Sequence, residues 1–355
     1  MEIFVMERHE KALEILHNGT VIPAIPLVLD ENRQFDEKGQ KRLTRYYLEA
    51  GAGGIAIAVH TTQFEIRDPK YNLFEKVITV VAKEIEKFEK ETGKVIVKVS
   101  GLCGNVDQAV KEAKIIKDLG FDAGLLSPGG THHLTEEQMI ERTKEVAKII
   151  SVIGFYLQPA ANGRRFSYNY WQQICEIDNV VAIKCAPFNR YDTIDVVRAK
   201  ALSSRADKIA LYTGNDDTIV FDLISKYEFN ENGKTYKAQF VGGLLGHWSV
   251  NTHASVELFN KIKALKEPTN EILTLAGQVT DMNAVLFDAR NNYKGNICGV
   301  HEMLRRQGLM KGIWCLDPNE RLSNGQAEEI ERTCKAYPYL TDDEFAKEFL
   351  KNYKD

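Results

Sequence analysis

The sequence predicts an α/β protein, a (β/α)8 TIM barrel with a C-terminal helical extension, and two observations carry this prediction. Eight short apolar runs suited to strands alternate with longer stretches of helical periodicity, which is typical of a parallel sheet with crossover helices. No Gly-x-Gly-x-x-Gly follows the first run, so a doubly wound dinucleotide-binding sheet is the weaker alternative. The expected strands are 21–26, 54–59, 95–99, 123–127, 154–158, 180–184, 209–213 and 239–242.

A candidate helix follows each expected strand, and several of these helices have recognisable ends. Thr135 precedes Glu136-Glu137-Gln138, so its hydroxyl oxygen can accept a free backbone N–H at a helix start. Gly51, Gly93 and Gly120 stand where helices should end in a left-handed residue. The expected helices are 37–50, 70–91, 106–119, 136–150, 168–177, 192–202, 218–226 and 250–265.

The 355 residues exceed the roughly 250 that such a barrel needs. We expect residues 1–267 to form the barrel with a short N-terminal helical lead-in, and residues 268–355 to form a helical module packed on it. Beyond residue 268 the sequence contains amphipathic stretches and no convincing strand; the stretches lie around 270–278, 281–293, 299–307 and 326–337. Asn232-Gly233 inside a polar insertion predicts a surface hairpin.

Composition excludes several classes of protein. Charged residues make up 27% and the net charge is −4, which shows no bias toward nucleic acid or an anionic membrane. The chain does not open on a basic segment followed by an apolar stretch, and no run approaches about 18 apolar residues. Six cysteines without a C-x-x-C pair argue against a zinc cluster. We expect a cytoplasmic protein with no metal, nucleic-acid or membrane partner.

Lys184 ends the apolar run 180–184, where an ammonium is costly to bury. In a barrel this strand end opens into the active-site mouth, and a desolvated, partly neutral lysine there can attack a carbonyl carbon to form a Schiff base. Such a role requires its pKa to fall from ~10.4 to roughly 7–8. The ordinary alternative is an amine that reaches bulk water. Cys185 should point to the opposite face, so we do not expect it to be a nucleophile.

Tyr156 precedes Lys184 by 28 residues, the difference between 184 and 156, which is about one strand-helix unit. The two side chains can therefore converge from neighbouring strands. A phenol at that place can shuttle protons while an imine forms and reacts. The mechanism expected from the sequence thus depends on Tyr156 and Lys184 sharing one face of the sheet.

Several motifs together resemble the dihydrodipicolinate synthase and N-acetylneuraminate lyase family of Schiff-base (class I) aldolases, of which the chain looks like a divergent member. The resemblance spans most of residues 20–340. The segments that carry it are Thr61-Thr62, the run from Gly154 through Tyr156 and Pro159 to Gly163, Ala182-Ile183-Lys184, Thr213-Gly214-Asn215-Asp216-Asp217, Gly242-Gly243 with Gly246, 299–308 and 316–318.

The resemblance implies that Lys184 forms the imine and Tyr156 transfers protons. It implies that Thr62 hydrogen-bonds this tyrosine and helps to bind the substrate carboxylate beside Thr61. Gly242 and Gly243 would let the backbone approach the ligand closely. The covalent lysine imine would need no further cofactor, the partner would be a small 2-oxo acid, and the protein would be a homo-oligomer, either a tetramer or a dimer.

Departures from the family pattern suggest an unusual substrate. His60 stands where the family usually has glycine, and Gly129-Gly130 replaces a pair of tyrosines. His132 or His133 could take over the missing phenol's role or contact a substrate hydroxyl, although adjacent loop histidines are commonly solvated. Ala161 stands at the family's arginine position, so a bidentate grip on a second carboxylate is lost. We expect His60 and His132 to bind substrate.

The sequence therefore supports three hypotheses of function. The first is a lyase in which Lys184 forms an imine with a 2-oxo acid such as pyruvate or a sugar-acid derivative. The second is a dehydratase or hydratase that uses the same Schiff base, since an enamine expels a β-hydroxyl equally well. The third is a catalytically silent barrel that binds a small metabolite.

Overall fold

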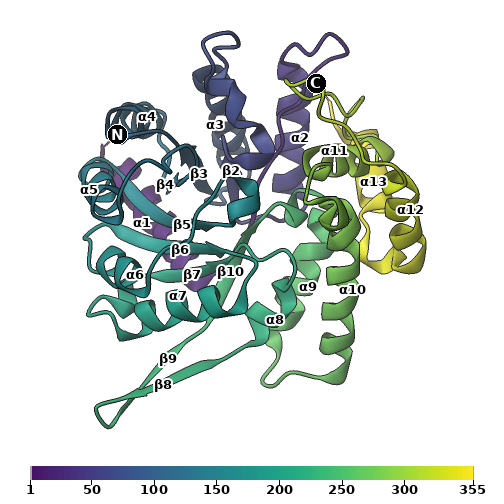
Figure 1. Cartoon of the computed structure of the whole chain (residues 1–355). Coiled ribbons are helices and arrows are strands. Elements are labelled where there is room, and N and C mark those ends of the chain that lie inside the picture. Colours follow the sequence, from purple (N-terminus) through teal and green to yellow (C-terminus); the bar gives the residue numbers. More distant parts are fainter. Residues whose placement is uncertain (1, 355) are drawn as a thin grey trace. The chain divides into compact units, whose positions relative to one another are not determined.

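The computed structural model describes residues 2–354 and confirms the predicted (β/α)8 barrel with additional C-terminal helices (Figure 1). The chain divides into two compact units, which are described separately. Unit 1 comprises Met1–Thr20 and Val97–Leu244, and unit 2 comprises Val21–Ile96 and Leu245–Asp355. Each strand of the barrel overlaps a predicted one: β1 Val21–Pro23, β2 Gly54–Ile57, β3 Val97–Leu102, β4 Ala123–Leu126, β5 Ser151–Leu157, β6 Val180–Ala186, β7 Ala210–Thr213 and β10 Phe240–Leu245.

Unit 1 contains parallel strands that pair in the order β3, β4, β5, β6, β7, β10. Helix α1, Glu2–Asn18, is the predicted lead-in and contacts β3, β6 and β7. The Tyr212 hydroxyl on β7 donates to the Leu16 carbonyl at 2.7 Å, which ties the sheet to that helix. The crossover helices of this unit are α4 Val106–Asp118, α5 Glu136–Ala147, α6 Tyr168–Cys175, α7 Arg190–Leu202 and α8 Ile219–Ile224.

An irregularity in the β5–β6 pairing decides which side chains share a face. Val152 pairs with Val180, but Ile153 pairs with Ala182, so Val181 is an extra residue in β6. Beyond this point Phe155 is opposite Lys184, and Tyr156 is opposite Cys185. Because strand side chains alternate between faces, a shift of one residue exchanges the side chain that accompanies Lys184.

Two glycines identify the faces independently. A Cβ placed on Gly154 would lie 3.6 Å from both Ile174 and Trp171 of helix α6, so Gly154 faces the helices. A Cβ placed on Gly214 would lie 2.6 Å from Lys184 Cε and 2.7 Å from Ala186 Cβ. Tyr156, two residues after Gly154, therefore lies on the helix-covered face, and Lys184 lies on the inner face.

Unit 2 holds the first two strands and the C-terminal helices. Ile25 N donates to Ala56 O at 2.9 Å beyond the end of β1. The Asp342 carboxylate accepts from the backbone N–H groups of His253 and Ala254 at 2.7 and 2.8 Å, so it caps the start of α9. The helices are α2 Glu37–Glu49, α3 Phe74–Thr92, α9 Thr252–Ala264, α10 Asn270–Leu286, α11 Asn296–Arg306, α12 Gln326–Ala336 and α13 Asp343–Asn352.

The C-terminal region differs from expectation in two details. Residues 270–278 and the start of the next predicted stretch form one continuous helix, α10, and α13 was not predicted. The domain boundary at residues 267 and 268 stays a prediction. No helix among residues 2–354 combines the length and apolar character needed to cross a bilayer.

The structure confirms two features that short sequence motifs predicted, the helix start at Thr135 and the hairpin at Asn232-Gly233. Gln138 N donates to Thr135 Oγ1 at 3.2 Å and Thr135 N donates to Gln138 Oε1 at 2.8 Å, which completes a capping box. The predicted hairpin is present as β8 Tyr227–Glu231 and β9 Lys234–Ala238, which project from unit 1 (Figure 1). Asn232 and Gly233 both have positive φ, as the two-residue turn requires.

We predict that Gly242→Ala destabilises the chain by about 1–3 kcal/mol, because the added methyl has no room. A Cβ at Gly242 would lie 2.5 Å from the Thr20 carbonyl oxygen and 2.8 Å from Tyr212 Cε1. Gly277→Ala is the matched control, since within the described chain nothing lies within 4 Å of a Cβ there and alanine favours a helix. Denaturant unfolding measures both variants, and equal stability of the two would contradict the packing argument.

Candidate active site

Lys184 lies near the carboxyl end of β6 and is only 8% exposed. Its Nζ is 4.5 Å from the centroid of the Phe155 ring on β5. On the other side its aliphatic stem packs on Gly214, directly after β7, where no larger residue fits. The amine is therefore held between an aromatic ring and bare backbone.

This surrounding makes the amine unusually easy to deprotonate. Burial lowers the pKa of Lys184 from its ordinary value of 10.5 to about 8, and the negative charge of Asp216 offsets part of that effect. Burial thus brings the pKa of Lys184 close to the range of roughly 7–8 that imine formation requires. A substantial fraction of the amine is neutral near pH 8, which is the form that attacks a carbonyl.

Tyr156 does not face Lys184, and the prediction that the two side chains converge is wrong. Its ring stacks on Trp171 of helix α6 with centroids 5.3 Å apart and an interplanar angle of 28°. Phe166 N donates to the Tyr156 hydroxyl at 3.4 Å, and burial raises the pKa of that phenol. The extra residue Val181 in β6 puts Lys184 opposite Phe155 on the inner face; without it Lys184 would be opposite Tyr156 on the helix-covered face.

Asp216 is the charged side chain that sequence reasoning did not assign a role. It follows β7 in a tight turn in which its backbone N–H donates to Gly214 O at 3.1 Å, and it is 9% exposed. Its carboxylate acts on the charge of Lys184. The Gly-x-Asp pattern after the seventh strand was the available signal, but nothing in it says which neighbour the aspartate approaches.

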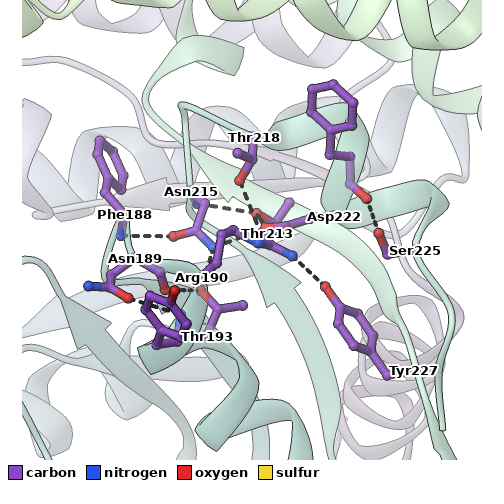
Figure 2. A network of polar contacts seen from close by, with 12 residues as sticks. Phe188, Asn189, Arg190, Thr193, Thr213, Asn215, Thr218, Asp222, Ser225 and Tyr227 are labelled. Carbon is purple, nitrogen blue, oxygen red and sulfur yellow. Dashed lines mark hydrogen bonds and ion pairs between the residues drawn. The ribbon is translucent and has the colours of Figure 1, made fainter.

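A polar network anchors this turn from the outer face (Figure 2). Thr213 Oγ1 and Asn215 Nδ2 both donate to Asp222 Oδ2 of helix α8, at 2.6 and 3.0 Å. Arg190 at the start of α7 pairs with the same carboxylate and also donates to the Tyr227 hydroxyl at 2.7 Å. Burial raises the pKa of Asp222, while Arg190 opposes that effect. The network is a structural support, and it fixes the backbone that carries Gly214 and Asp216.

Cys185 belongs to the same outer face, as the sequence predicted. It is paired with Tyr156 and Thr213, and it is fully buried. Burial raises the pKa of its thiol well above the usual value. A buried thiol of this kind is a poor nucleophile.

The threonines predicted to bind a carboxylate lie together in unit 2, in a short 3-10 turn formed by His60–Thr62. Thr61 Oγ1 donates to Ala24 O at 2.7 Å, and Thr62 Oγ1 donates to Ile25 O at 2.8 Å. Each hydroxyl proton is therefore already used by the backbone beyond β1. In this arrangement the hydroxyls can accept a hydrogen bond but cannot donate one to a carboxylate. The partnership of Thr62 with Tyr156 stays a prediction.

The two predicted substrate-binding histidines have neighbours in their own units. The half-buried His60 ring lies edge-on to Phe64 at 5.9 Å between ring centroids. His132 is exposed, and its Nε2 lies 2.9 Å from Asn162 Oδ1, which links the loops after β4 and β5. Their contact with a substrate stays a prediction.

Gly242 and Gly243 lie inside β10, opposite Tyr212 and Thr213, and not in a turn after it. The lack of a side chain at Gly242 is explained by the close approach of Thr20 and Tyr212. A ligand is not needed to account for that glycine, and the role of Gly243 stays a prediction. Across residues 2–354 no group of three or more His, Cys, Asp or Glu side chains is placed to hold a metal ion.

Comparisons with known proteins agree with the fold. A model of the dihydrodipicolinate synthetase family matches residues 17–226. A 4-hydroxy-tetrahydrodipicolinate synthase from Clostridium novyi (strain NT) is 32% identical over 141 residues, which are 39% of this chain and 46% of that protein. The chain thus matches about half the length of this curated relative.

Two solved structures illustrate the range of similar barrels. The chloride-inhibited dihydrodipicolinate synthase from Acinetobacter baumannii, complexed with pyruvate, has a TM-score of 0.73 at 22% identity and covers 90% of this chain and 99% of its own. An N-acetylneuraminate lyase from Mycoplasma synoviae has a TM-score of 0.68 at 16% identity, covering 91% and 98%. These likenesses concern the fold. Because the family model covers more than half of the 355 residues, the chain belongs to the dihydrodipicolinate synthetase family.

Proposed function

We propose that the chain is a lyase in which Lys184 forms a Schiff base with a 2-oxo acid, such as pyruvate or a sugar-acid derivative. The single observation that carries the proposal is an amine buried near the carboxyl end of β6, with a pKa lowered to about 8. Active sites of (β/α)8 barrels lie at this end of the strands. Family membership and the pyruvate held by the Acinetobacter relative support the choice of substrate class.

The proposed reaction uses the electrophilic 2-oxo carbon of the substrate. The neutral amine adds to the 2-oxo carbon, water leaves, and the protonated imine then accepts an electron pair from the neighbouring carbon. Cleavage or formation of a carbon–carbon bond completes a lyase reaction. Loss of a β-hydroxyl from the same enamine would make the chain a dehydratase, which is the alternative within this chemistry. A barrel that only binds a metabolite is the alternative outside it.

Reductive trapping tests the proposal. We predict that pyruvate with borohydride adds one reduced adduct to the intact protein, and that Lys184→Met abolishes the adduct. Lys200→Met is the matched control, because burial also lowers the pKa of that lysine, which lies on helix α7. Intact-mass measurement reads out the three proteins. An adduct on Lys184→Met, or no adduct on the unmodified chain with any of a panel of 2-oxo acids, would overturn the assignment.

We predict that trapping accelerates as pH rises through about 8, since only the neutral amine of Lys184 reacts. Titration of 13C-labelled lysines by NMR measures the cause directly. One resonance should titrate near pH 8 and should be missing in Lys184→Met. If every lysine resonance titrates near its usual value of ~10.4, the amine is not desolvated as described.

Lys184→Met should also stabilise the folded chain. A pKa lowered from 10.5 to about 8 costs the folded state about 3 kcal/mol below pH 8, at about 1.4 kcal/mol per pH unit. Between pH 8 and 10.5 the unfolded lysine binds a proton that the folded one does not, so the stability of the unmodified chain rises with pH. Urea unfolding at pH 7 should show the variant to be more stable by about 2–4 kcal/mol, and the gap should narrow toward pH 10. A less stable variant would contradict this.

A further inference from the structure

Two thiols of unit 2 lie in contact, away from the lysine described above. Cys298 Sγ in helix α11 is 3.7 Å from Cys315 Sγ in the segment that follows this helix. Both residues are fully buried, and both are free thiols. A disulfide requires a sulfur–sulfur distance of about 2.05 Å, so a modest approach of the two segments would join them.

A shared hydrogen-bond acceptor brings these two sulfurs together, although they belong to residues 17 positions apart. The Cys298 and Cys315 thiols both donate to the Ile313 carbonyl, with sulfur–oxygen distances of 3.8 and 3.7 Å. Ile297 belongs to the same apolar cluster. The backbone around Ile313 is therefore positioned by both thiols, and oxidation of the thiols removes both donors.

The pair lies behind one wall of a polar cavity. The half-buried Leu322 packs against the cluster that contains Cys298 and Cys315. The same leucine lines a cavity of about 880 Å³ between segments 290–294 and 317–324. Lining residues such as Arg290 and Asn319 are exposed, so the cavity is open to solvent. A small oxidant in this cavity reaches the thiols when the Leu322 side chain moves aside.

The segment that carries Cys315 also holds the loop after β2. Leu316 N donates to Gln63 Oε1 at 2.6 Å, and Leu316 O accepts from the Tyr71 hydroxyl at 3.1 Å. Gln63 directly follows the 3-10 turn His60–Thr62. Movement of Cys315 toward helix α11 therefore acts on the hydrogen bonds that hold this loop.

The two thiols have different surroundings. The hydrogen bond with Cys298, and burial after it, raise the pKa of the Cys315 thiol, which therefore keeps its proton. Cys298 is the third residue of α11, and the first turn of a helix favours negative charge on sulfur. Buried thiols react slowly with oxidants, but a second thiol in contact captures an oxidised sulfur efficiently. Cys298 is thus suited to react first and Cys315 to complete the bond.

We propose that Cys298 and Cys315 form a reversible disulfide that changes how the loop after β2 is held. The inference is independent of imine formation at Lys184. Hydrogen peroxide is the oxidant: the Cys298 sulfur attacks one peroxide oxygen, the O–O bond breaks, and water leaves a sulfenic acid behind. The Cys315 sulfur then attacks that sulfur, its proton goes to the departing hydroxyl, and a second water leaves. Two thiols are oxidised, and one peroxide is reduced to two water molecules.

Counting thiols in the full-length chain tests the disulfide. The folded chain is treated with hydrogen peroxide, freed of it, denatured, alkylated with iodoacetamide and analysed by mass spectrometry. The reduced chain has six thiols, and the oxidised chain should have four, which is six minus the two joined. Digestion should give one linked peptide pair, Cys298 with Cys315, and dithiothreitol should restore the full count. An unchanged count, a link between other cysteines, or oxidation that dithiothreitol does not reverse would overturn the inference.

Alanine variants provide the matched comparison. Neither Cys298→Ala nor Cys315→Ala should give a linked peptide after peroxide treatment. Cys175→Ala is the control, because Cys175 in helix α6 is equally buried, and it should give the same link as the unmodified chain. A link that persists in Cys315→Ala would contradict the assignment. If a variant does not fold, the linked peptide of the unmodified chain still decides the case.

Hydrogen exchange measures the effect on the loop after β2. The backbone N–H of Leu316 reports its bond to Gln63 directly. It should exchange about tenfold faster in the oxidised chain, the effect of losing one hydrogen bond. The Gln138 N–H, which donates to Thr135 in unit 1, is the internal control and should not change. Equal exchange of Leu316 in the reduced and oxidised chains would refute the effect on the loop.

Discussion

The pairing register of β6 against β5 is the constraint on which the site depends. One extra residue at Val181 places Lys184 on the inner face opposite Phe155, whereas Tyr156 of β5 faces helix α6. A β-bulge changes the face on which later side chains of its strand lie, because it leaves one residue unpaired and preserves the rest of the ladder. The identity of the group that faces the amine follows from this single insertion.

The inner face then combines two opposing effects on Lys184. Burial against an aromatic ring and glycine backbone disfavours the ammonium, and the Asp216 carboxylate partly restores it. An amine strongly paired with a carboxylate stays charged, whereas burial favours the neutral form that attacks a carbonyl. The outer network of Arg190, Asp222 and Asn215 supports this balance by fixing the turn, without contributing a charge to the inner face (Figure 2).

Much of the fold could be predicted because its signals are local. The eight strands, the Thr135 capping box and the Asn232-Gly233 hairpin each depend on residues close together in the sequence. The lysine could be found for the same reason, since a charged residue ending an apolar strand is unusual. The partner of that lysine could not be found in this way. A spacing of 28 residues sets which strands are neighbours, but it does not set the register between them, and no residue near Val181 indicates a bulge.

The roles predicted for Thr61, Thr62 and Gly242 depended on family resemblance and not on local chemistry. The Thr61 and Thr62 hydroxyls donate to backbone carbonyls, and Gly242 makes room for Tyr212. A sequence motif does not reveal such structural roles.

A crystal structure of the chain reduced in the presence of pyruvate tests the central claim most directly. We predict continuous density from Lys184 Nζ into the adduct, with Tyr156 still stacked on Trp171. An unmodified Lys184, or an adduct contacted by the Tyr156 hydroxyl, would contradict it.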